Sequence, residues 1–187
     1  QNALQSTAKK LELAGAPANL EPTMFLALQF IIAIVFGGFL FIIFAFAQVA
    51  WPLGTRLIIV ALFIFLGFYF PQLWLTSKIN KRQKEVRKAM PDALDLLTIC
   101  VEAGLGFDAA MAKVSEKWDN ELSLAFARII QEVQLGKLRR DAMRNMADRM
   151  GIPEMTSFVA AIIQSEQLGV SMAKVLRIQS EQMRIKR

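Results

Sequence analysis

The chain has 187 residues, of which 55% are hydrophobic, with a mean hydropathy of +0.38 and a formal net charge of +6. This composition is too apolar for an ordinary soluble domain. A single cysteine, Cys100, excludes an intramolecular disulfide and any multi-cysteine metal site. The absence of histidine removes imidazole as a general base and as a metal ligand. No glycine-rich nucleotide-binding motif occurs either. The sequence therefore predicts a protein that is not an enzyme, with no catalytic residue, no cofactor and no metal site.

The first 22 residues predict a short amphipathic helix. Leu4, Ala8 and Leu11 recur on one side of it, and Gly15 and Pro17 end it. We expect this segment, residues 1–22, to lie along the membrane surface.

Residues 24–75 contain one charged residue, Arg56. Residues 24–50 exceed the ~20 residues that a helix needs to cross the hydrocarbon core, and residues 57–75 are close to that minimum. Helix breakers and a charge lie between them, at residues 51–56, where Arg56 is interpreted as a water-facing loop charge. The pattern predicts a transmembrane helical hairpin over residues 23–76. A buried hairpin of a large soluble protein is the alternative, which is disfavoured because soluble helices rarely lack charge on every face.

Trp51, Tyr69 and Trp74 lie where aromatic residues gather at membrane interfaces. Pro71 lies near one end of the second span, where neighbouring helices can absorb a kink.

A basic helix is predicted at residues 77–89, immediately after the second span. Its six basic residues are Lys78, Lys81, Arg82, Lys84, Arg87 and Lys88. Residues 91–187 carry thirteen basic and thirteen acidic residues, so they contribute no net charge. By the positive-inside rule the basic helix is cytoplasmic, and two spans bring the N-terminal segment to the same side. Nucleic-acid binding is a weaker interpretation, because the basic run has no interleaved aromatic residues.

An internal repeat follows, marked by Gly104, Gly136 and Gly169. Apolar residues stand 14, 10, 7 and 3 positions before each glycine, a spacing that describes one face of a helix. They are Met90, Leu94, Leu97 and Val101; Leu122, Phe126, Ile129 and Val133; and Met155, Val159, Ile162 and, in place of a valine, Glu166. Seven residues after each glycine come Met111, Met143 and Leu176, on the expected return helix.

Each repeat therefore predicts a helix, a turn at glycine and a second helix. Pro91 is expected to begin this domain, residues 90–187, and Asp119, Pro153 and Ser171 are candidate helix starts. The predicted fold class is all-α: a membrane protein with a transmembrane helical hairpin and a cytoplasmic antiparallel bundle of repeated α-hairpins.

Several strings in this domain resemble the type II secretion system F domain family. They are Met90-Pro-Asp-Ala-Leu-Asp-Leu-Leu, Val101-Glu-Ala-Gly-Leu-Gly-Phe, Gly151-Ile-Pro, Ser157-Phe-Val-Ala-Ala-Ile-Ile-Gln-Ser-Glu-Gln-Leu-Gly169 and Gln182-Met-Arg-Ile-Lys-Arg187. With Leu11-Glu-Leu-Ala-Gly15, they are most similar to the C-type platform protein of Tad (Flp) pilus machines. Members of the family continue into a further transmembrane segment, so we expect the chain to be part of a longer protein.

The resemblance implies a multi-pass protein of the bacterial inner membrane, with both terminal parts in the cytoplasm. Its implied partners are the lipid bilayer, a cytoplasmic hexameric secretion ATPase, prepilin, and a B-type paralogue or further copies of itself, but no nucleic acid. The implied function is to couple the ATPase to prepilin extraction and pilus assembly. A membrane-anchored signalling transducer is the alternative; the short predicted loop leaves no room for a sensor domain.

The candidate partner-binding residues are Glu102, Glu166, Arg177 and Arg184. Glu102 is either a solvated helix-end charge or a partner contact. Glu166 interrupts an apolar face, where an unpaired carboxylate is costly to bury. Either the third hairpin leaves this end of its face exposed, or Glu166 pairs with Arg177, with Arg184 or with a partner subunit.

Cys100 is interpreted as a buried apolar residue rather than a redox thiol. Eight methionines follow residue 89 and fill either a core or a plastic groove for a partner. They are Met90, Met111, Met143, Met146, Met150, Met155, Met172 and Met183.

Overall fold

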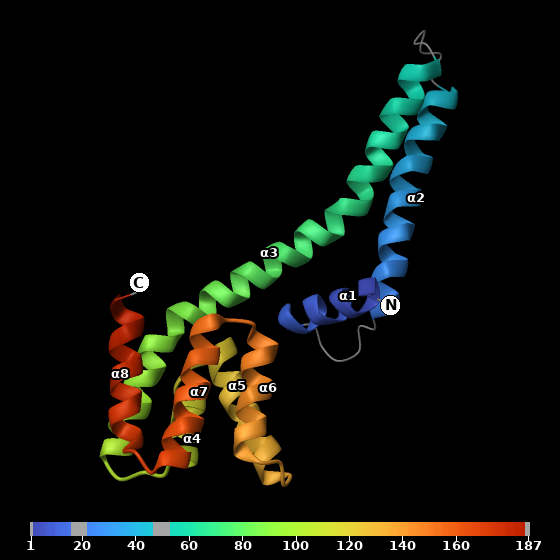
Figure 1. Ribbon diagram of the computed structural model, residues 1–187. Helices are drawn as coiled ribbons and strands as arrows, with labels where there is room; N and C mark the ends of the chain where they lie inside the picture. The colour runs from blue at the N-terminus through green and yellow to red at the C-terminus, as the bar shows by residue number, and fades with distance from the viewer. Residues whose placement is uncertain (1, 16–21, 47–52, 186–187) are drawn as a thin grey trace. The chain divides into compact units, whose positions relative to one another are not determined.

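The computed structural model describes residues 2–15, 22–46 and 53–185, which form eight helices and no strand (Figure 1). The all-α fold class is therefore confirmed for the described residues. The chain divides into two compact units, Gln1–Asn80 and Lys81–Arg187, each with its own hydrophobic core.

Helix α1 (Asn2–Leu13) opens the first unit and is followed by Gly15 in the left-handed region, with φ of 69°. The predicted short helix and its glycine end are confirmed, while Pro17 lies outside the described residues. Leu11 and Ala14 are buried in a small core with Phe25, Leu75 and Ile79. The end of α1 at Leu11 therefore packs within the first unit, whereas Leu4, on the same predicted apolar side, is 42% exposed.

Helices α2 (Pro22–Phe46) and α3 (Leu53–Glu102) contribute the other side chains of that core. The Phe30 and Phe68 rings meet edge to face, with centroids 5.9 Å apart. A Cβ atom at Gly37 would lie 2.4 Å from Cγ1 of Ile64. Residues later in α2 thus meet residues earlier in α3, which makes the two helices an antiparallel pair.

Large apolar side chains cover the outside of this pair. Exposed examples are Ile31, Ile34, Phe36, Leu62, Phe65 and Leu73. Among the described residues, Ala61–Glu102 is long and apolar enough to cross a membrane, and Thr23–Phe39 is a shorter apolar helix. Residues 47–52, including Trp51, lie outside the described residues.

Two predicted boundaries in α3 are wrong. The loop was expected to reach Arg56, but α3 begins at Leu53 and includes Gly54, because glycine keeps its backbone N–H and costs a helix only about 1 kcal/mol relative to alanine. Pro91 was expected to start a new element, yet α3 continues through it and through Pro71. A proline inside a helix removes one bond, and packing of the flanking turns offsets that local loss. Both prolines are buried.

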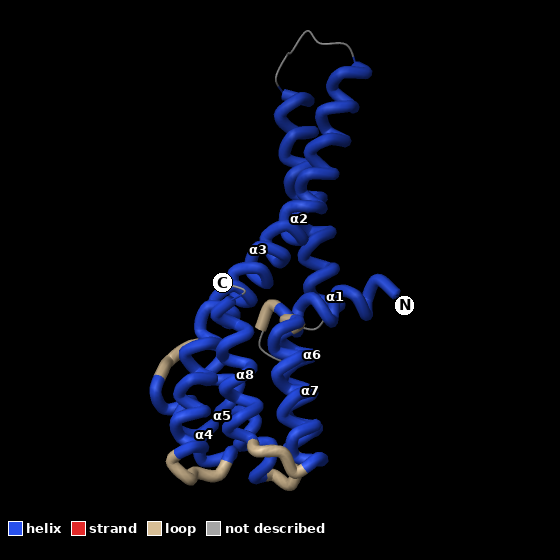
Figure 2. The backbone as a smooth tube through the Cα atoms, turned by 60° about the vertical axis from the view of Figure 1, so that its left-hand side comes forward, coloured by secondary structure: helices blue, strands red, loops and turns tan. Residues whose placement is uncertain are grey.

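The second unit contains the end of α3 and five further helices (Figure 2). They are α4 (Phe107–Lys117), α5 (Glu121–Gln134), α6 (Arg139–Met150), α7 (Pro153–Leu168) and α8 (Met172–Ile185). Each of α5 to α8 packs against the helix before it. The turns from α3 to α4, from α5 to α6 and from α7 to α8 lie at the same end of this unit (Figures 1 and 2), and the sequence places Gly104, Gly136 and Gly169 in them.

The three glycines have φ of 91°, 91° and 66°, the left-handed region that favours glycine over other residues. The repeat face predicted before them is confirmed as the core. Leu97, Ile129 and Ile162 are completely buried, and so are Met111, Met143 and Leu176 on the return helices.

Seven of the eight methionines are buried and the eighth, Met172, packs against the core, so these side chains are part of the core. Cys100 is buried in the same core, as predicted.

The observed helix starts agree in part with those predicted from the sequence. Pro153 is in the first turn of α7, as predicted. The cap of α5 is Asn120 rather than Asp119, because the Asn120 side chain accepts a hydrogen bond from the Ser123 amide. Gly151, identified from the sequence only within the family-like string Gly151-Ile-Pro, ends α6 with φ of 60°.

Part of the predicted basic helix packs on the second unit. Arg82 pairs with Glu121 at 2.7 Å. The Gln83 amide donates to the carbonyl oxygens of Met150 and Gly151, both at 3.0 Å. These contacts join α3 to the start of α5 and to the end of α6.

Candidate interaction sites

Glu102 and Arg177 form one exposed ion pair. Glu102 is the last residue of α3 and Arg177 lies in α8, with 3.8 Å between the carboxylate and the guanidinium. More than two fifths of each side chain is accessible. Exposed pairs of this kind contribute ~0–1 kcal/mol. Both groups therefore remain accessible to a partner.

Arg184 pairs with Asp95 of α3 at 2.5 Å. The hydroxyl of buried Ser180 donates to the same carboxylate. Asp95 thus fastens α8 to α3.

Glu166 pairs with Arg139, not with Arg177 or Arg184. The distance between its carboxylate and the Arg139 guanidinium is 2.6 Å, and 26% of the Glu166 side chain is exposed. The hairpin end is therefore not simply exposed, and the predicted pairs with Arg177 and Arg184 are not formed, while a contact with a partner subunit stays a prediction. The start of α6 lies beside the end of α7, since these helices run antiparallel, and this arrangement supplies the cation.

Arg139 joins three helices at the turn end of the unit. It also pairs with Asp108 of α4 at 3.1 Å and lies 6.0 Å from the centre of the Phe107 ring. Its Nε atom is buried without a hydrogen-bond partner. Because the guanidinium is planar and always charged, one arginine can hold two carboxylates on different helices.

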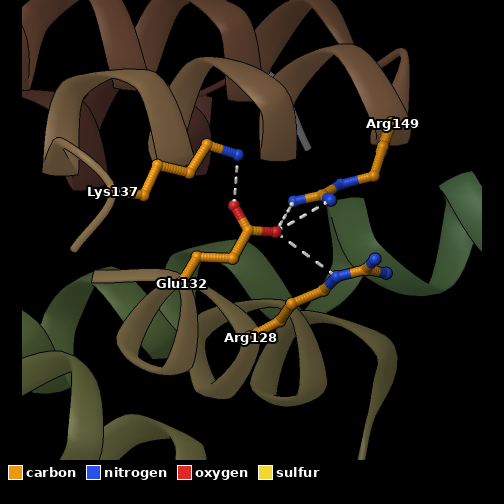
Figure 3. A network of polar contacts seen from close by, with 4 residues as sticks. All are labelled: Arg128, Glu132, Lys137 and Arg149. Carbon is orange, nitrogen blue, oxygen red and sulfur yellow. Dashed lines mark hydrogen bonds and ion pairs between the residues drawn. The ribbon is translucent and has the colours of Figure 1, made fainter. Parts of the chain in front are cut away.

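Glu132, in the last turns of α5, is surrounded by three cations (Figure 3). Lys137, in the turn, is 2.6 Å away, and both terminal nitrogens of Arg149 donate to the carboxylate at 3.0 Å. Arg128, one turn earlier on α5, is 3.4 Å away. Only 17% of the Glu132 side chain is exposed, so this carboxylate is more shielded from water than Glu102.

Burial by itself raises the pKa of the Glu132 carboxyl, but the hydrogen bonds from Lys137 and Arg149 and their charges together hold that pKa below its ordinary value of 4.5. The group stays ionised at neutral pH and is unsuited to donate a proton. Three cations around one anion leave a local charge of about +2. Sequence reasoning missed this site; the Arg128 to Glu132 spacing of four residues was its only local signal.

The three glycine turns expose apolar side chains, which we call the turn-end patch. It consists of Leu105, Leu135, Leu138, Leu168 and Val170. Leu135 is 88% exposed, in a unit whose other large apolar residues are mostly buried. Exposed apolar groups gathered at one end of a domain are typical of interaction surfaces.

The fold and these sites define a class of protein: a helical chain with an apolar antiparallel helix pair and a repeated helical unit held by ion pairs. Residues 93–187 match the family model described as type II secretion system (T2SS), protein F. The match covers just over half of the chain and nearly all of the second unit, so the chain belongs to this family. Proteins of the family are inner-membrane platforms of type II secretion and pilus machines. No curated protein and no solved structure matches the chain.

Proposed function

We propose that the chain is a platform protein of a Tad (Flp) pilus or related type II secretion machine, and that it couples a cytoplasmic secretion ATPase to prepilin extraction and pilus assembly. The family match over residues 93–187 carries this proposal. The strings that begin at Leu11, Met90 and Ser157 support the Tad type. The family match does not favour a signalling transducer.

In the proposed arrangement, two spans at residues 24–50 and 57–75 hold the chain in the inner membrane, and residues 1–22 and 77–187 are cytoplasmic. Helix α3 contributes to the cores of both units. Movement of the repeated unit would therefore act on the apolar segment through the same helix. The chain catalyses no reaction itself, and the ATPase supplies the energy.

We assign the ATPase contact to the turn-end patch. Its apolar side chains come from all three repeats, so one partner surface can contact every hairpin of the unit. The accessible pair of Glu102 and Arg177 lies at the same end, beside Gly104. Apolar residues at the centre of an interface with charged residues at its rim are the usual arrangement in protein complexes. A B-type paralogue or a second copy is the further partner.

The test replaces Leu135 and Leu168 together by aspartate. Both side chains are exposed, so the fold should persist. Charge at the centre of the contact should lower the amount of cognate ATPase that co-purifies with the chain from solubilised membranes at least tenfold. Leu124→Asp is the matched control, because Leu124 is exposed near the start of α5, away from the glycine turns. If equal amounts of ATPase co-purify with the Leu135→Asp/Leu168→Asp protein and with the Leu124→Asp protein, the assigned surface is refuted. If no ATPase co-purifies with the unaltered chain, the coupling is refuted.

A further inference from the structure

A hollow of about 310 Å³ opens among α3, α7 and α8 in the second unit, at the end opposite the glycine turns. Met90 and Met183 supply apolar lining, while Lys84, Arg87, Lys88 and Glu154 add charged groups. The volume is at the lower end of the ~300–1,000 Å³ range of ligand pockets. The hollow therefore suits a small apolar group that is accompanied by charge.

The positive charge beside this hollow is unbalanced. Arg87 is neutralised by Glu154 at 3.2 Å. Every arginine among residues 82–184 makes an ion pair, whereas Lys84 and Lys88 make none within the part of the chain that the structure describes. Glu85, on the same helix, is exposed and does not line the hollow. Two lysines thus stand unpaired beside apolar lining.

We propose that this hollow binds an acidic segment of a protein partner, with one large apolar side chain against Met90 and Met183 and two carboxylates against Lys84 and Lys88. The two lysines are four residues apart on α3, so their Cβ atoms are ~6 Å apart. Carboxylates three or four residues apart on a partner helix have the same spacing. The charges and the apolar lining are therefore matched by one short amphipathic sequence.

An anionic lipid fits this site less well. Lys84 lies nine residues beyond Leu75, the last apolar residue of the predicted span, which is ~14 Å along a helix. Met90 lies fifteen residues beyond it, ~22 Å. The headgroup layer on each side of a bilayer is only ~5–8 Å thick. Measured along α3, the residues that line the hollow therefore begin farther from the predicted span than the headgroup layer is thick, which favours a cytoplasmic protein segment over a lipid.

The test selects random 12-residue peptides displayed on phage against the full chain in detergent. We expect enriched peptides to carry two carboxylates three or four positions apart beside Leu, Phe or Met. They should bind the Lys84→Glu/Lys88→Glu protein at least tenfold more weakly. The matched control is Lys117→Glu/Lys174→Glu, which makes the same charge change at two exposed lysines that also lack ion pairs and do not line the hollow, and which should bind as the unaltered chain does.

Three outcomes would overturn the proposal. Selection could yield no acidic, apolar peptide family, or the enriched peptides could bind both double variants equally. Alternatively, native mass spectrometry could show phosphatidylglycerol retained by the unaltered chain and lost only from Lys84→Glu/Lys88→Glu, which would make the occupant a lipid. These readouts do not involve the ATPase, so they stand apart from the test of the turn-end patch.

Discussion

Three cations hold the carboxylate of Glu132, and each comes from a different place in the chain. Arg128 precedes it on α5, Lys137 follows in the turn, and Arg149 lies at the far end of α6. The carboxylate therefore connects the two helices of the second hairpin. Its low exposure makes these contacts stronger than surface ion pairs, because water screens them less.

This geometry predicts a pH-dependent contribution to stability. The pKa of Glu132 is lower in the folded protein than in the unfolded chain, so the unfolded chain binds more protons between the two pKa values. The contribution is complete above the unfolded value, near 4.5, and disappears as the pH falls through the folded pKa. Glu132→Gln should lower the free energy of unfolding by about 1–3 kcal/mol at pH 7. Below pH 4.5, the free energy of unfolding of the Glu132→Gln protein should also fall less steeply than that of the unaltered protein.

Denaturant unfolding of the two proteins at several pH values measures this difference. Glu116→Gln is the control, because Glu116 is exposed and pairs with Lys113 alone. We expect that change to alter stability by no more than about 0.5 kcal/mol. If Glu132→Gln and Glu116→Gln give the same curves, the Glu132 network does not stabilise the fold.

Pairings between distant residues were hard to predict from the sequence. Glu166 was correctly identified as an anomaly on its helix face, but its partner Arg139 lies 27 positions earlier. Finding it requires knowing that the start of α6 lies beside the end of α7. Spacing within one helix identifies a face, whereas an ion pair between helices depends on their packing.

Gly37 and Gly38 are neighbours in α2 with different surroundings. A Cβ at Gly37 would meet Ile64 at 2.4 Å, while a Cβ at Gly38 would meet nothing within 4 Å. Gly37→Ala should therefore force α2 and α3 apart and destabilise their packing by about 1–3 kcal/mol. Gly38→Ala should be neutral or stabilising by up to about 1 kcal/mol, because alanine favours the helix.

Thermal unfolding of both variants in the same detergent tests this pair. The second change Ile64→Ala, made in the Gly37→Ala protein, should restore part of the loss by removing the clashing atoms. Equal melting temperatures for Gly37→Ala and Gly38→Ala would show that α2 and α3 do not approach closely at this point.

Helix faces and turns in the second unit were predictable because they follow from local chemistry. The spacing before Gly104, Gly136 and Gly169 placed Leu97 and its counterparts in the core, where they are found. The continuity of α3 was not predictable in the same way. A proline such as Pro91 weakens a helix at one bond, but packing of Met90 and Leu94 in the core decides whether the helix continues.

Helix α3 connects two chemically different environments. Its early residues belong to the apolar pair with α2, and its residues from Val86 onward belong to the core of the repeated unit. Between them, Lys78 lies 5.3 Å from the Trp74 ring, an aromatic and a cation one turn apart. This pairing is typical of a membrane interface, so the end of the span is expected near Trp74.

Membrane orientation follows from charge and can be tested with single cysteines in a Cys100→Ala background. Six basic residues at 78–88 favour the cytoplasmic side, whereas the segment between the proposed spans, residues 51–56, carries only Arg56. A cysteine at Thr55, which is exposed, should react in intact cells with a thiol reagent that does not cross the inner membrane. A cysteine at Ser115 or at Lys117 should react only after the membrane is opened; Lys117 is the better position because Ser115 is half-buried. Labelling of Lys117→Cys in intact cells, with Thr55→Cys protected, would reverse the orientation and place the repeated unit where no cytoplasmic ATPase can reach it.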